Sequence, residues 1–511
     1  MAEIIFVLPN DGEKPRGKQV VPDESLTIIN VAHDGGIDIT ATCGERGKCR
    51  ACRIKILSGQ VPPPTMQDRI QLGEEEIRDN FRLACQTKVI SDCKVLLAPP
   101  TKESGYQIMG ADLETQRVGL ELDSGVEKFL IEAKAPTEEH HQTSDVEEML
   151  KCLPEEIDRC LPLFILRQVP AVLRDKQGSM TVTTFNDRVI SIESGDTTGK
   201  KYGMAFDIGT TSIVGNLLDI DSGEQLATVG NVNPQAQFGG DLMSRIAYAM
   251  FDTKKLTALR SKALNAITGF IREACEMAGI EPEQIHKIVV VGNTCMHHVF
   301  LGVDPTYVGL APYAPVVRTS LSFHSSELPL KGAPNAVVCL LPIVAGFVGA
   351  DTIACILATK IYDSKKKRAL VDIGTNGEVV MGDHTGLMAC SAPAGPALEG
   401  AQIRHGMRGA VGAIEKVSID DDVACQVIGS APAIGICGSG LVDAAAAMKS
   451  ASVMAPSGLL KAENSSRLPN NLRQRFSKTD DGKEQFVLVW ANESGREEDI
   501  VLTQNLIIIC I

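Results

Sequence analysis

The stretch Cys43-Gly-Glu-Arg-Gly-Lys-Cys49-Arg-Ala-Cys52 carries three cysteines with the spacing C-x5-C-x2-C, and a fourth, Cys85, follows further along the chain. Iron–sulfur clusters are held by four cysteine thiolates, and plant-type [2Fe-2S] proteins take three of them from one short loop. Structural zinc is the alternative, but all-cysteine zinc sites usually combine two C-x2-C pairs, and this region has only one. The pattern therefore favours a [2Fe-2S] cluster held by Cys43, Cys49, Cys52 and Cys85.

The loop is rich in small and basic residues, among them Gly44, Arg46, Gly47, Lys48 and Arg50. Glycine lets backbone N–H groups turn toward an anionic cluster, and the cations offset the charge of the cluster. The spacing resembles that of the adrenodoxin-like branch of [2Fe-2S] ferredoxins. We therefore expect an electron to enter or leave the protein at this loop.

The composition is that of a long, acidic chain with mainly aliphatic cores. The chain has 511 residues, a formal net charge of −14 and 4% aromatic residues, so about three domains are expected. Cations attract nucleic acid and anionic membrane surfaces, and the acidic balance argues against both partners. The N-terminus lacks the basic region of a signal peptide, which predicts a cytoplasmic protein with reduced thiols.

The most apolar segment, 336–358, is expected to form a buried strand, turn and helix. Asp351 interrupts it, and a carboxylate in the middle of a bilayer is costly. Pro342, Gly346 and Gly349 further favour a turn inside the segment.

Changes in composition divide the chain into domains. Residues 1–98 are expected to form a β-rich, ferredoxin-like domain, and residues 99–125, which begin with two prolines, a linker. Residues 126–200 are expected to form a small α/β domain. Residues 201–511 alternate glycine-punctuated strands with alanine-rich helices and are expected to form a larger α/β domain. Expected elements include strands at 4–8, 53–57 and 180–184, a helix or turn at 26–32, and a helix at 146–153.

The sequence Phe206-Asp-Ile-Gly-Thr-Thr-Ser212 recurs as Val371-Asp-Ile-Gly-Thr-Asn-Gly377, and such a repeat indicates a duplicated fold. In each copy an apolar strand ends at Asp-Ile-Gly-Thr and a second strand follows, which predicts a β-hairpin with a glycine turn. Glycine permits close approach to a phosphate, hydroxyl and N–H groups donate to its oxygens, and the Asp faces Mg2+ or its waters. The phosphate-binding candidates are Gly209, Thr210, Thr211, Ser212, Gly374, Thr375 and Asn376, and the catalytic candidates are Asp207 and Asp372.

The two hairpins resemble the paired phosphate motifs of the superfamily that contains acetate and sugar kinases, heat-shock chaperone ATPases and actin. In that fold, two related α/β subdomains clasp ATP. A further glycine turn, Gly438-Ser439-Gly440, precedes an alanine-rich helix whose N-terminus suits an anion. Tight packing of a strand against this helix explains the same glycines equally well.

Two groups of histidines are considered as candidate metal ligands. Cys295, His297 and His298 follow a buried strand, and a core or surface role is favoured for them. The pair His140-His141 is expected to be solvated, because no further ligand recurs nearby at metal-binding spacing.

The order of a [2Fe-2S] domain, a small middle domain and an ATPase of this superfamily resembles the reductive activators of corrinoid proteins. The resemblance covers essentially the whole chain, and further segments that carry it are Val291-Gly-Asn-Thr-Cys-Met-His-His298 and Ala394-Gly-Pro-Ala-Leu-Glu-Gly400. It implies a multidomain α+β and α/β protein. Its parts would be a β-grasp-like ferredoxin domain, a small middle domain and an actin-like ATPase domain with duplicated α/β subdomains.

The resemblance also implies an activity, cofactors and partners. The protein would return inactive Co(II) to Co(I) in a corrinoid protein of a methyltransferase system, by one-electron transfer coupled to ATP hydrolysis. The implied cofactors are the [2Fe-2S] cluster, ATP and Mg2+. A low-potential electron donor is the other implied partner, and a homodimer is compatible with the resemblance. In this interpretation Asp207 and Asp372 organise Mg2+ and water.

The C-terminus departs from the family pattern. The family continues beyond the equivalent of Asp499-Ile-Val-Leu-Thr-Gln504 to an adenosine motif of the Ala-Gly-Gly-Phe-Gly type. Here the chain ends in Asn505-Leu-Ile-Ile-Ile-Cys-Ile511 without that motif. We therefore expect a C-terminally incomplete ATPase domain with weakened ATP binding.

Two other functions are compatible with parts of the sequence. The first is an ATP-driven electron activase of another low-potential enzyme, such as a 2-hydroxyacyl-CoA dehydratase. Activators of that kind carry a [4Fe-4S] cluster and no ferredoxin domain, so the cysteine loop counts against it. The second is a non-catalytic redox adaptor with a degenerate ATPase half, which only the C-terminal departure supports.

Overall fold

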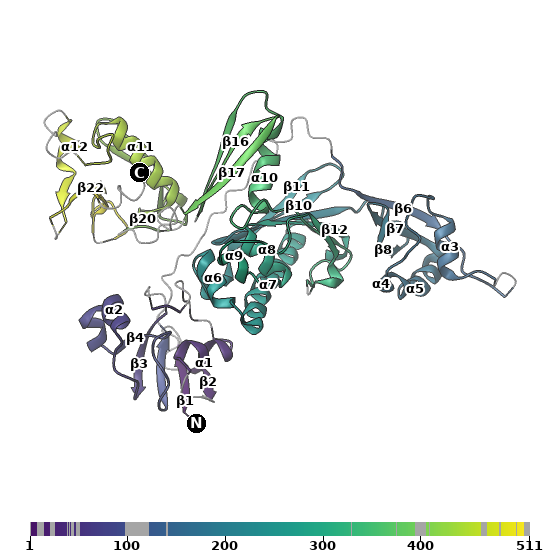
Figure 1. Ribbon diagram of the computed structural model, residues 1–511, viewed down its shortest axis with the longest axis horizontal. Coiled ribbons are helices and arrows are strands. Elements are labelled where there is room, and N and C mark those ends of the chain that lie inside the picture. Colours follow the sequence, from purple (N-terminus) through teal and green to yellow (C-terminus); the bar gives the residue numbers. More distant parts are fainter. Residues whose placement is uncertain are drawn as a thin grey trace. The chain divides into compact units, whose positions relative to one another are not determined.

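The structure is a computed structural model of the chain (Figure 1). It describes residues 2–7, 15–20, 26–37, 39, 41, 45–47, 52–97, 122–138, 142–328, 330–374, 376–393, 405–407, 409–460, 468–479, 482–496 and 498–504. These residues form two compact units. The first takes in those of Met1–Leu97 and Gly110–Lys360, and the second takes in those of Ile361–Ile511.

The first unit begins with a five-stranded sheet of order β2-β1-β5-β3-β4. Its elements are β1 (Glu3–Val7), β2 (Pro15–Val20), α1 (Ile28–Asp34), β3 (Arg53–Gly59), α2 (Met66–Arg78), β4 (Phe81–Leu83) and β5 (Cys93–Leu97). β1 and β5 pair in parallel, which requires a long crossover, and both helices lie within it. Ile4, Phe6, Ile28 and Val95 are fully buried in the core. The strands expected near 4–8 and 53–57 and a helix near 26–32 are confirmed.

A three-stranded antiparallel sheet of order β6-β7-β8 follows. Its strands are β6 (Val126–Glu132), β7 (Ser179–Phe185) and β8 (Arg188–Ser194), and its helices are α3 (Asp145–Lys151), α4 (Leu163–Leu166), α5 (Val169–Arg174) and the 3-10 turn η2 (Asp175–Gly178). Ser144 caps α3 by accepting a hydrogen bond from the Glu147 amide. The helix expected at 146–153 and the strand expected at 180–184 are therefore confirmed.

The next part of the first unit, here called the first lobe, is built on a six-stranded sheet of order β11-β10-β9-β12-β14-β13. Its strands are β9 (Tyr202–Ile208), β10 (Ser212–Asp219), β11 (Gln225–Val232), β12 (Ile285–Gly292), β13 (Leu321–His324) and β14 (Val337–Leu340). Its helices are η3 (Pro234–Gln237), α6 (Leu242–Ala249), α7 (Thr253–Ala278), η4 (Pro282–Gln284), α8 (Thr294–Leu301), α9 (Thr306–Gly309), η5 (Ser325–Glu327) and α10 (Ala350–Thr359). The central strands β9, β12 and β14 are parallel, so their carboxyl ends share one edge of the sheet.

The long helix α7 packs against this sheet and is fixed at both ends. Asp252 accepts hydrogen bonds from the amides of Lys254 and Lys255, and Gly279 ends the helix in the left-handed conformation with φ of 67°. Such an end favours glycine because a Cβ would be strained there. Leu259, Ile267 and Ile271 on α7 are buried in the lobe core.

The second unit contains three three-stranded sheets, β15-β16-β17, β19-β18-β20 and β21-β22-β23. Its elements are η6 (Ile361–Asp363), β15 (Arg368–Ile373), β16 (Asn376–Asp383), β17 (Gly386–Pro393), β18 (Ala413–Ile419), β19 (Val423–Val427), η8 (Ile428–Ser430), β20 (Gly435–Ile436), α11 (Gly438–Ser450), α12 (Asn470–Gln474), β21 (Phe476–Lys478), β22 (Glu484–Val489) and β23 (Ile500–Thr503). A core that contains Ile414, Leu441 and Phe486 joins the second and third sheets.

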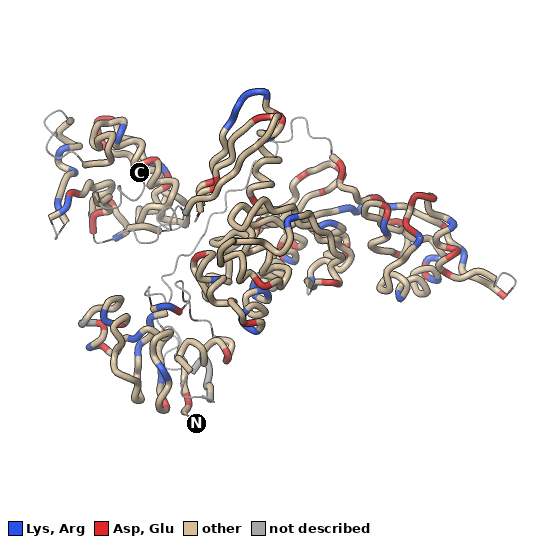
Figure 2. The backbone as a smooth tube through the Cα atoms, viewed as in Figure 1, with Lys and Arg blue, Asp and Glu red and all other residues tan. Residues whose placement is uncertain are grey.

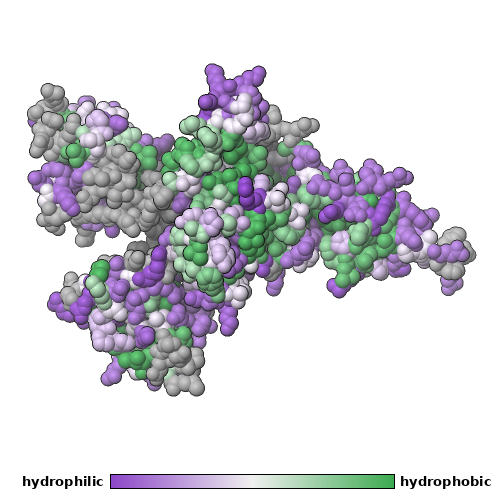
Figure 3. Space-filling view, viewed as in Figure 1, coloured by the Kyte–Doolittle hydropathy of each residue, from purple (hydrophilic) through white to green (hydrophobic). Residues whose placement is uncertain are grey.

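The β15-β16-β17 sheet exposes large apolar side chains. Val371, Ile373, Met381 and Met388 are each more than half exposed, and Figure 3 shows hydrophobic residues gathered over these strands. A basic run, 365–368, leads into β15 and is seen as a continuous blue stretch in Figure 2. Apolar patches of this kind mark surfaces that bind other protein elements.

The apolar segment at 336–358 supplies the strand β14 and the helix α10, as expected. The expected burial holds for β14 but not for α10, of which only Ala350 and Thr352 are buried while Leu357 is exposed. Among the described helices, none combines the length and hydropathy needed to cross a membrane.

A buried polar cluster joins the β6-β7-β8 sheet to the first lobe. The Lys128 ammonium lies 2.9 Å from the Glu193 carboxylate and donates to the carbonyls of Thr197 and Lys200. His286 of β12 is fully buried, with Nε2 3.8 Å from the same carboxylate. Burial, followed by the positive charge of Lys128, lowers the pKa of His286 to about 3.

Acidification is expected to destabilise the fold through His286. The unfolded chain binds a proton at this histidine below pH of about 6.5, but the folded chain binds it only near pH 3, so stability falls as the pH drops through this window. Between pH 7 and pH 5, the free energy of unfolding of a His286→Gln variant is expected to fall by about 2 kcal/mol less than that of the parent chain. Urea unfolding at the two pH values measures the difference. Equal losses in both chains would contradict the assignment.

Candidate functional site

Two of the four candidate cluster ligands lie together in the first unit. Cys52 directly precedes β3 and Cys85 closely follows β4, and these two strands pair with Arg53 opposite Leu83. The Ala84 amide continues the pairing by donating to the Cys52 carbonyl, at 2.9 Å. The two sulfur atoms are consequently 3.4 Å apart, and both side chains are buried.

This sulfur spacing fits a shared metal ion. A disulfide holds its sulfurs at about 2.05 Å, whereas a tetrahedral ion with bonds of about 2.3 Å separates two sulfur ligands by about 3.8 Å. Cys43 and Cys49 lie outside the described residues. Within the described part of the chain, no three His, Cys, Asp or Glu side chains converge on one point. The four-cysteine site therefore remains a prediction, and the structure places two of its candidate residues, Cys52 and Cys85, close together.

Sequence reasoning missed Gln86 beside this pair. Its side-chain amide donates to the Cys85 sulfur at 3.4 Å and to the Glu45 carbonyl at 3.0 Å, so it ties the loop to the second cysteine. Gly47 faces the same amide with φ of +65°, and a Cβ there would lie 2.8 Å from the Gln86 side chain. Hydrogen bonds to ligand sulfurs tune the potential of a cluster, which makes Gln86 a further candidate residue of the predicted cluster site.

The first hairpin forms as expected. β9 ends with Asp207 and Ile208, Gly209–Thr211 make the turn, and Ser212 begins β10. Asp207 and Ser212 are exposed, and Thr210 is buried. The Thr211 hydroxyl is buried without a hydrogen-bond partner among the described residues. Because buried hydroxyl groups are usually hydrogen-bonded, Thr211 keeps its place among the candidate ligand-binding residues.

The turn lies at the edge where the parallel strands end. Asp207 is in register with Val291, so the turn after β12 is adjacent, and Asn293 of that turn caps α8 and donates to the Thr210 hydroxyl at 3.1 Å. Gly349, which begins α10, lies so close that a Cβ would be 2.5 Å from the Asn293 Cα. Ligands of α/β sheets bind outside the carboxyl ends of parallel strands. The candidate phosphate-binding residues of the first hairpin therefore lie at the edge of the sheet where ligands of this fold class bind.

The second hairpin, β15–β16, lies in the second unit. Asp372 is in register with Glu378, both side chains are partly buried, and the Gly374 amide donates to the Asn376 carbonyl at 3.1 Å. Thr375 lies outside the described residues. The duplication of the hairpin is therefore present, while the roles of these residues toward a nucleotide remain predictions.

Gly438, Ser439 and Gly440 form the first turn of α11 rather than a turn that precedes it, and Gly440 has a packing explanation. A Cβ on Gly440 would lie 2.1 Å from the carbonyl oxygen of Ile414 on β18, so only glycine allows this helix to approach its sheet. The Ser439 hydroxyl lies 3.2 Å from the Cys437 sulfur. For Gly440, packing alone explains the residue, and anion binding by Gly438 and Ser439 is untested.

Cys295, His297 and His298 belong to the core of the first lobe. All three are buried in α8, and His298 accepts a hydrogen bond from the Val316 amide at 2.9 Å. Burial raises the pKa of the Cys295 thiol to about 12. The expected core role suits this arrangement better than a metal site, and His140-His141 lie outside the described residues.

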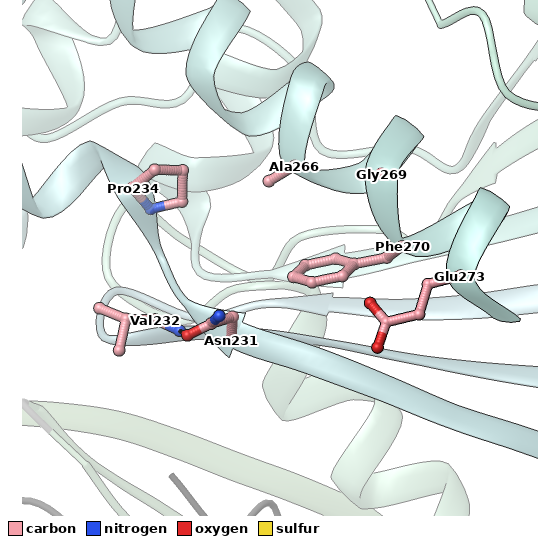
Figure 4. Close-up of a pocket in the computed structure, with 7 residues that line it drawn as sticks. All are labelled: Asn231, Val232, Pro234, Ala266, Gly269, Phe270 and Glu273. Atoms are coloured by element: carbon pink, nitrogen blue, oxygen red, sulfur yellow. Dashed lines mark hydrogen bonds between the residues drawn. The ribbon is translucent and has the colours of Figure 1, made fainter. Parts of the chain in front are cut away.

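A separate hollow of about 430 Å3 lies between β11 and α7 (Figure 4). Phe270 and Glu273 project into it from α7, opposite Asn231 and Val232. None of the phosphate-binding candidates lines it.

Comparison with known proteins finds family models over four successive parts of the chain. Models of a 2Fe-2S iron-sulfur cluster binding domain, the RACo linker region, the RACo middle region and the C-terminal ASKHA domain of RACo match residues 12–89, 115–199, 202–364 and 366–510. The class is thus an iron–sulfur protein that joins a [2Fe-2S] ferredoxin-type domain to an ASKHA domain, and the expected fold is confirmed.

The individual relatives are more specific. The chain is 31% identical over 490 residues to the corrinoid activation enzyme RamQ of Eubacterium limosum, covering 95% of this chain and 78% of that protein. It is 28% identical over 222 residues to a [Co(II) methylated amine-specific corrinoid protein] reductase of Methanosarcina barkeri, covering 42% of this chain and 40% of that protein. A solved reductive activator for corrinoid, iron-sulfur protein matches with a TM-score of 0.65 and 32% identity, over 99% of this chain and 80% of that one. The chain belongs to the RACo family, the reductive activators of corrinoid proteins.

Proposed function

We propose that this chain reduces the cobalt of a corrinoid protein from Co(II) to Co(I), one electron at a time, and that it hydrolyses ATP to do so. One observation carries the proposal: a single chain of this family combines a closely spaced, buried cysteine pair with a phosphate-type turn at the edge of the sheet in its RACo middle region. The relatives that act on corrinoid proteins support this client over another low-potential enzyme.

The roles of the N-terminal residues follow from their chemistry. Cys52 and Cys85 would bind one iron, and Cys43 and Cys49 would complete the four thiolates. The bound cluster would supply a one-electron carrier. Gln86 would hold a hydrogen bond on the Cys85 sulfur, and the buried position of both described cysteines would keep water from that side of the site.

The nucleotide site is proposed in the same terms. Thr210, Thr211 and Ser212 would donate to phosphate oxygens, with Gly209 allowing their approach, and Gly374, Thr375 and Asn376 would do the same from the second hairpin. Asp207 and Asp372 would hold Mg2+ and its waters. Gly438, Ser439 and the N-terminus of α11 are proposed as a further contact for the nucleotide.

Coupling to ATP has an energetic reason. A plant-type [2Fe-2S] centre has a potential near −400 mV, and each 59 mV of uphill one-electron transfer costs about 1.4 kcal/mol. Nucleotide binding must therefore alter the corrinoid partner or its ligation before a very low-potential cobalt accepts the electron. A low-potential donor is needed to refill the cluster.

The domain boundaries proposed are those expected from the sequence: 1–98, 99–125, 126–200 and 201–511. We propose the cytoplasm as the compartment, because its reducing conditions keep cysteine thiols available to bind iron.

Reduction of a purified Co(II) corrinoid protein, followed by visible absorption with a low-potential donor, tests the proposal. Co(I) is expected to form when ATP and Mg2+ are both present and to be at least about tenfold slower when either is omitted. Equal rates with and without ATP would contradict the coupling. Failure to form Co(I) with any corrinoid client would contradict the activity.

A further inference from the structure

The segment Asn233–Arg245, which comprises η3 and the first turn of α6, holds the backbone of the phosphate turn. The Asn233 side-chain amide donates to the Gly209 carbonyl and the Asn233 backbone amide donates to the Thr211 carbonyl, each at 2.8 Å. The Arg245 guanidinium donates to the carbonyl between them, that of Thr210. All three carbonyls of the turn are thus fixed by one short segment.

Arg245 is placed to act on the phosphate-facing side of the turn through the backbone. It is fully buried, and it also donates to the Gly239 carbonyl at 2.8 Å and to the Gln235 side chain at 3.2 Å. The Thr210 carbonyl belongs to the same peptide group as the Thr211 N–H. A cation on the carbonyl polarises that group and makes its N–H a better donor, and an anion on the N–H strengthens the carbonyl as an acceptor.

The same segment also contacts the cysteine loop of the N-terminal domain, within the same compact unit. The Ala41 amide donates to the Gln237 carbonyl at 3.0 Å, and the Arg46 guanidinium lies 3.8 Å from the Asp241 carboxylate. Ala41 and Arg46 flank Cys43 in the sequence.

Aromatic rings also contact one another between the N-terminal domain and this segment. His33 of α1 meets the buried ring of Phe238 edge-on at 5.3 Å, and Phe238 stacks on Tyr248 at 4.8 Å. The ion pair is almost half exposed, so solvent screens it, and it strengthens the docking by no more than about fivefold. The described residues Ala41, Arg46 and His33 thus hold this side of the N-terminal domain against the segment.

We propose that Asn233–Arg245 couples the phosphate turn to the cysteine loop, with Arg245 as the positioning residue. Phosphate binding strengthens the hydrogen bonds from Arg245 and Asn233 to the turn, orders the segment and tightens the docking of the loop on Gln237, Phe238 and Asp241. The coupling is reciprocal, so a docked loop raises the affinity for ATP by the same factor. This inference rests on the proposed binding of ATP at the turn.

Hydrogen exchange of single amides in the full-length chain tests the coupling. The Thr211 amide reports binding of the nucleotide, and the Ala41 amide reports docking, because its exchange requires the bond to Gln237 to open. ATP is expected to slow exchange at both amides in the parent chain, by at least about threefold at Ala41. The Arg245→Lys variant keeps the positive charge but loses the several N–H donors of the guanidinium. In this variant, ATP is expected to slow amide exchange at Thr211 and to leave amide exchange at Ala41 unchanged.

The matched control is Arg272→Lys, the same change at an exposed position on α7, which should behave as the parent chain does. If Arg245→Lys does not fold, Arg46→Gln with Asp241→Asn replaces it. Asparagine keeps the side-chain oxygen that caps α6 while removing the charge. In that variant Ala41 is expected to exchange faster without ATP, while Thr211 still responds.

The outcomes separate the coupling from the proposed function. Three results would overturn the coupling alone. In the parent chain, ATP slows amide exchange at Thr211 but not at Ala41. In Arg245→Lys, ATP slows exchange at Ala41 as much as in the parent chain, or in the double variant the exchange rate of Ala41 is unchanged. No effect of ATP at Thr211 in the parent chain would overturn both the coupling and the proposed nucleotide site.

Discussion

Replacement of Cys85 by serine is expected to lower the rate of Co(I) formation more than about 100-fold, because even residues that only support cluster ligands typically account for 10- to 100-fold. Cys85 lies 3.4 Å from Cys52, at the spacing of two thiolates on one ion. Serine places a weaker, protonated ligand at that position, so the site loses one of four thiolates. Iron and acid-labile sulfide per chain, together with the visible spectrum, measure the loss directly.

Cys93→Ser is the matched control for this experiment. Cys93 is a buried thiol of the same domain, on β5, and burial raises its pKa to about 11. It should keep the iron content and the cluster spectrum of the parent chain. A normal [2Fe-2S] spectrum in Cys85→Ser, or an equal loss of iron in both variants, would contradict the ligand assignment.

Replacement of Asp207 by asparagine is expected to reduce ATP hydrolysis about 100-fold while leaving the cluster spectrum unchanged. Asp207 is exposed at the carboxyl end of β9, beside the Gly209–Thr211 turn. A carboxylate at this edge suits Mg2+, and the neutral amide keeps its size but not its charge. Phosphate release at saturating ATP and Mg2+ measures the effect.

Asp221→Asn controls for a general loss of negative charge on the first lobe. Asp221 is exposed and pairs with Lys201 at 2.5 Å, beyond the other end of the same hairpin. Its variant should hydrolyse ATP at the parental rate. If Asp207→Asn hydrolyses ATP at the parental rate, Asp207 does not belong to the proposed site. If the hydrolysis rate falls equally in both variants, the effect comes from the loss of negative charge and not from the position of Asp207.

Features written in short stretches of sequence could be predicted well. The C-x5-C-x2-C spacing and the two Asp-Ile-Gly-Thr repeats identified the ferredoxin-type domain and the duplicated hairpins, because chemistry fixes both the residue types and their separation. The family resemblance, now confirmed by a relative that matches over 95% of the chain, came from the order of these parts.

Contacts between distant segments could not be predicted in this way. Gln86 reaches the Cys85 sulfur and Arg245 reaches the Thr210 carbonyl only because the fold brings their elements together. Arg245 is the single charged residue of the otherwise mostly apolar helix α6, which marks it as unusual in the sequence. The spacing of residues in the sequence could not show that it contacts the Thr210 carbonyl. The structural requirement for Gly440 likewise depends on β18, which lies earlier in the chain.

The most direct test of the whole account is a single-turnover experiment. The cluster is reduced first, excess donor is removed, and the chain is mixed rapidly with a Co(II) corrinoid protein while both absorbances are followed. With ATP and Mg2+, we predict that the cluster is oxidised and Co(I) appears at the same rate and in equal amounts, and that neither happens without ATP. Cluster oxidation without Co(I), or Co(I) formation at the same rate without ATP, would contradict an ATP-driven transfer of the electron from the cysteine-bound cluster to cobalt.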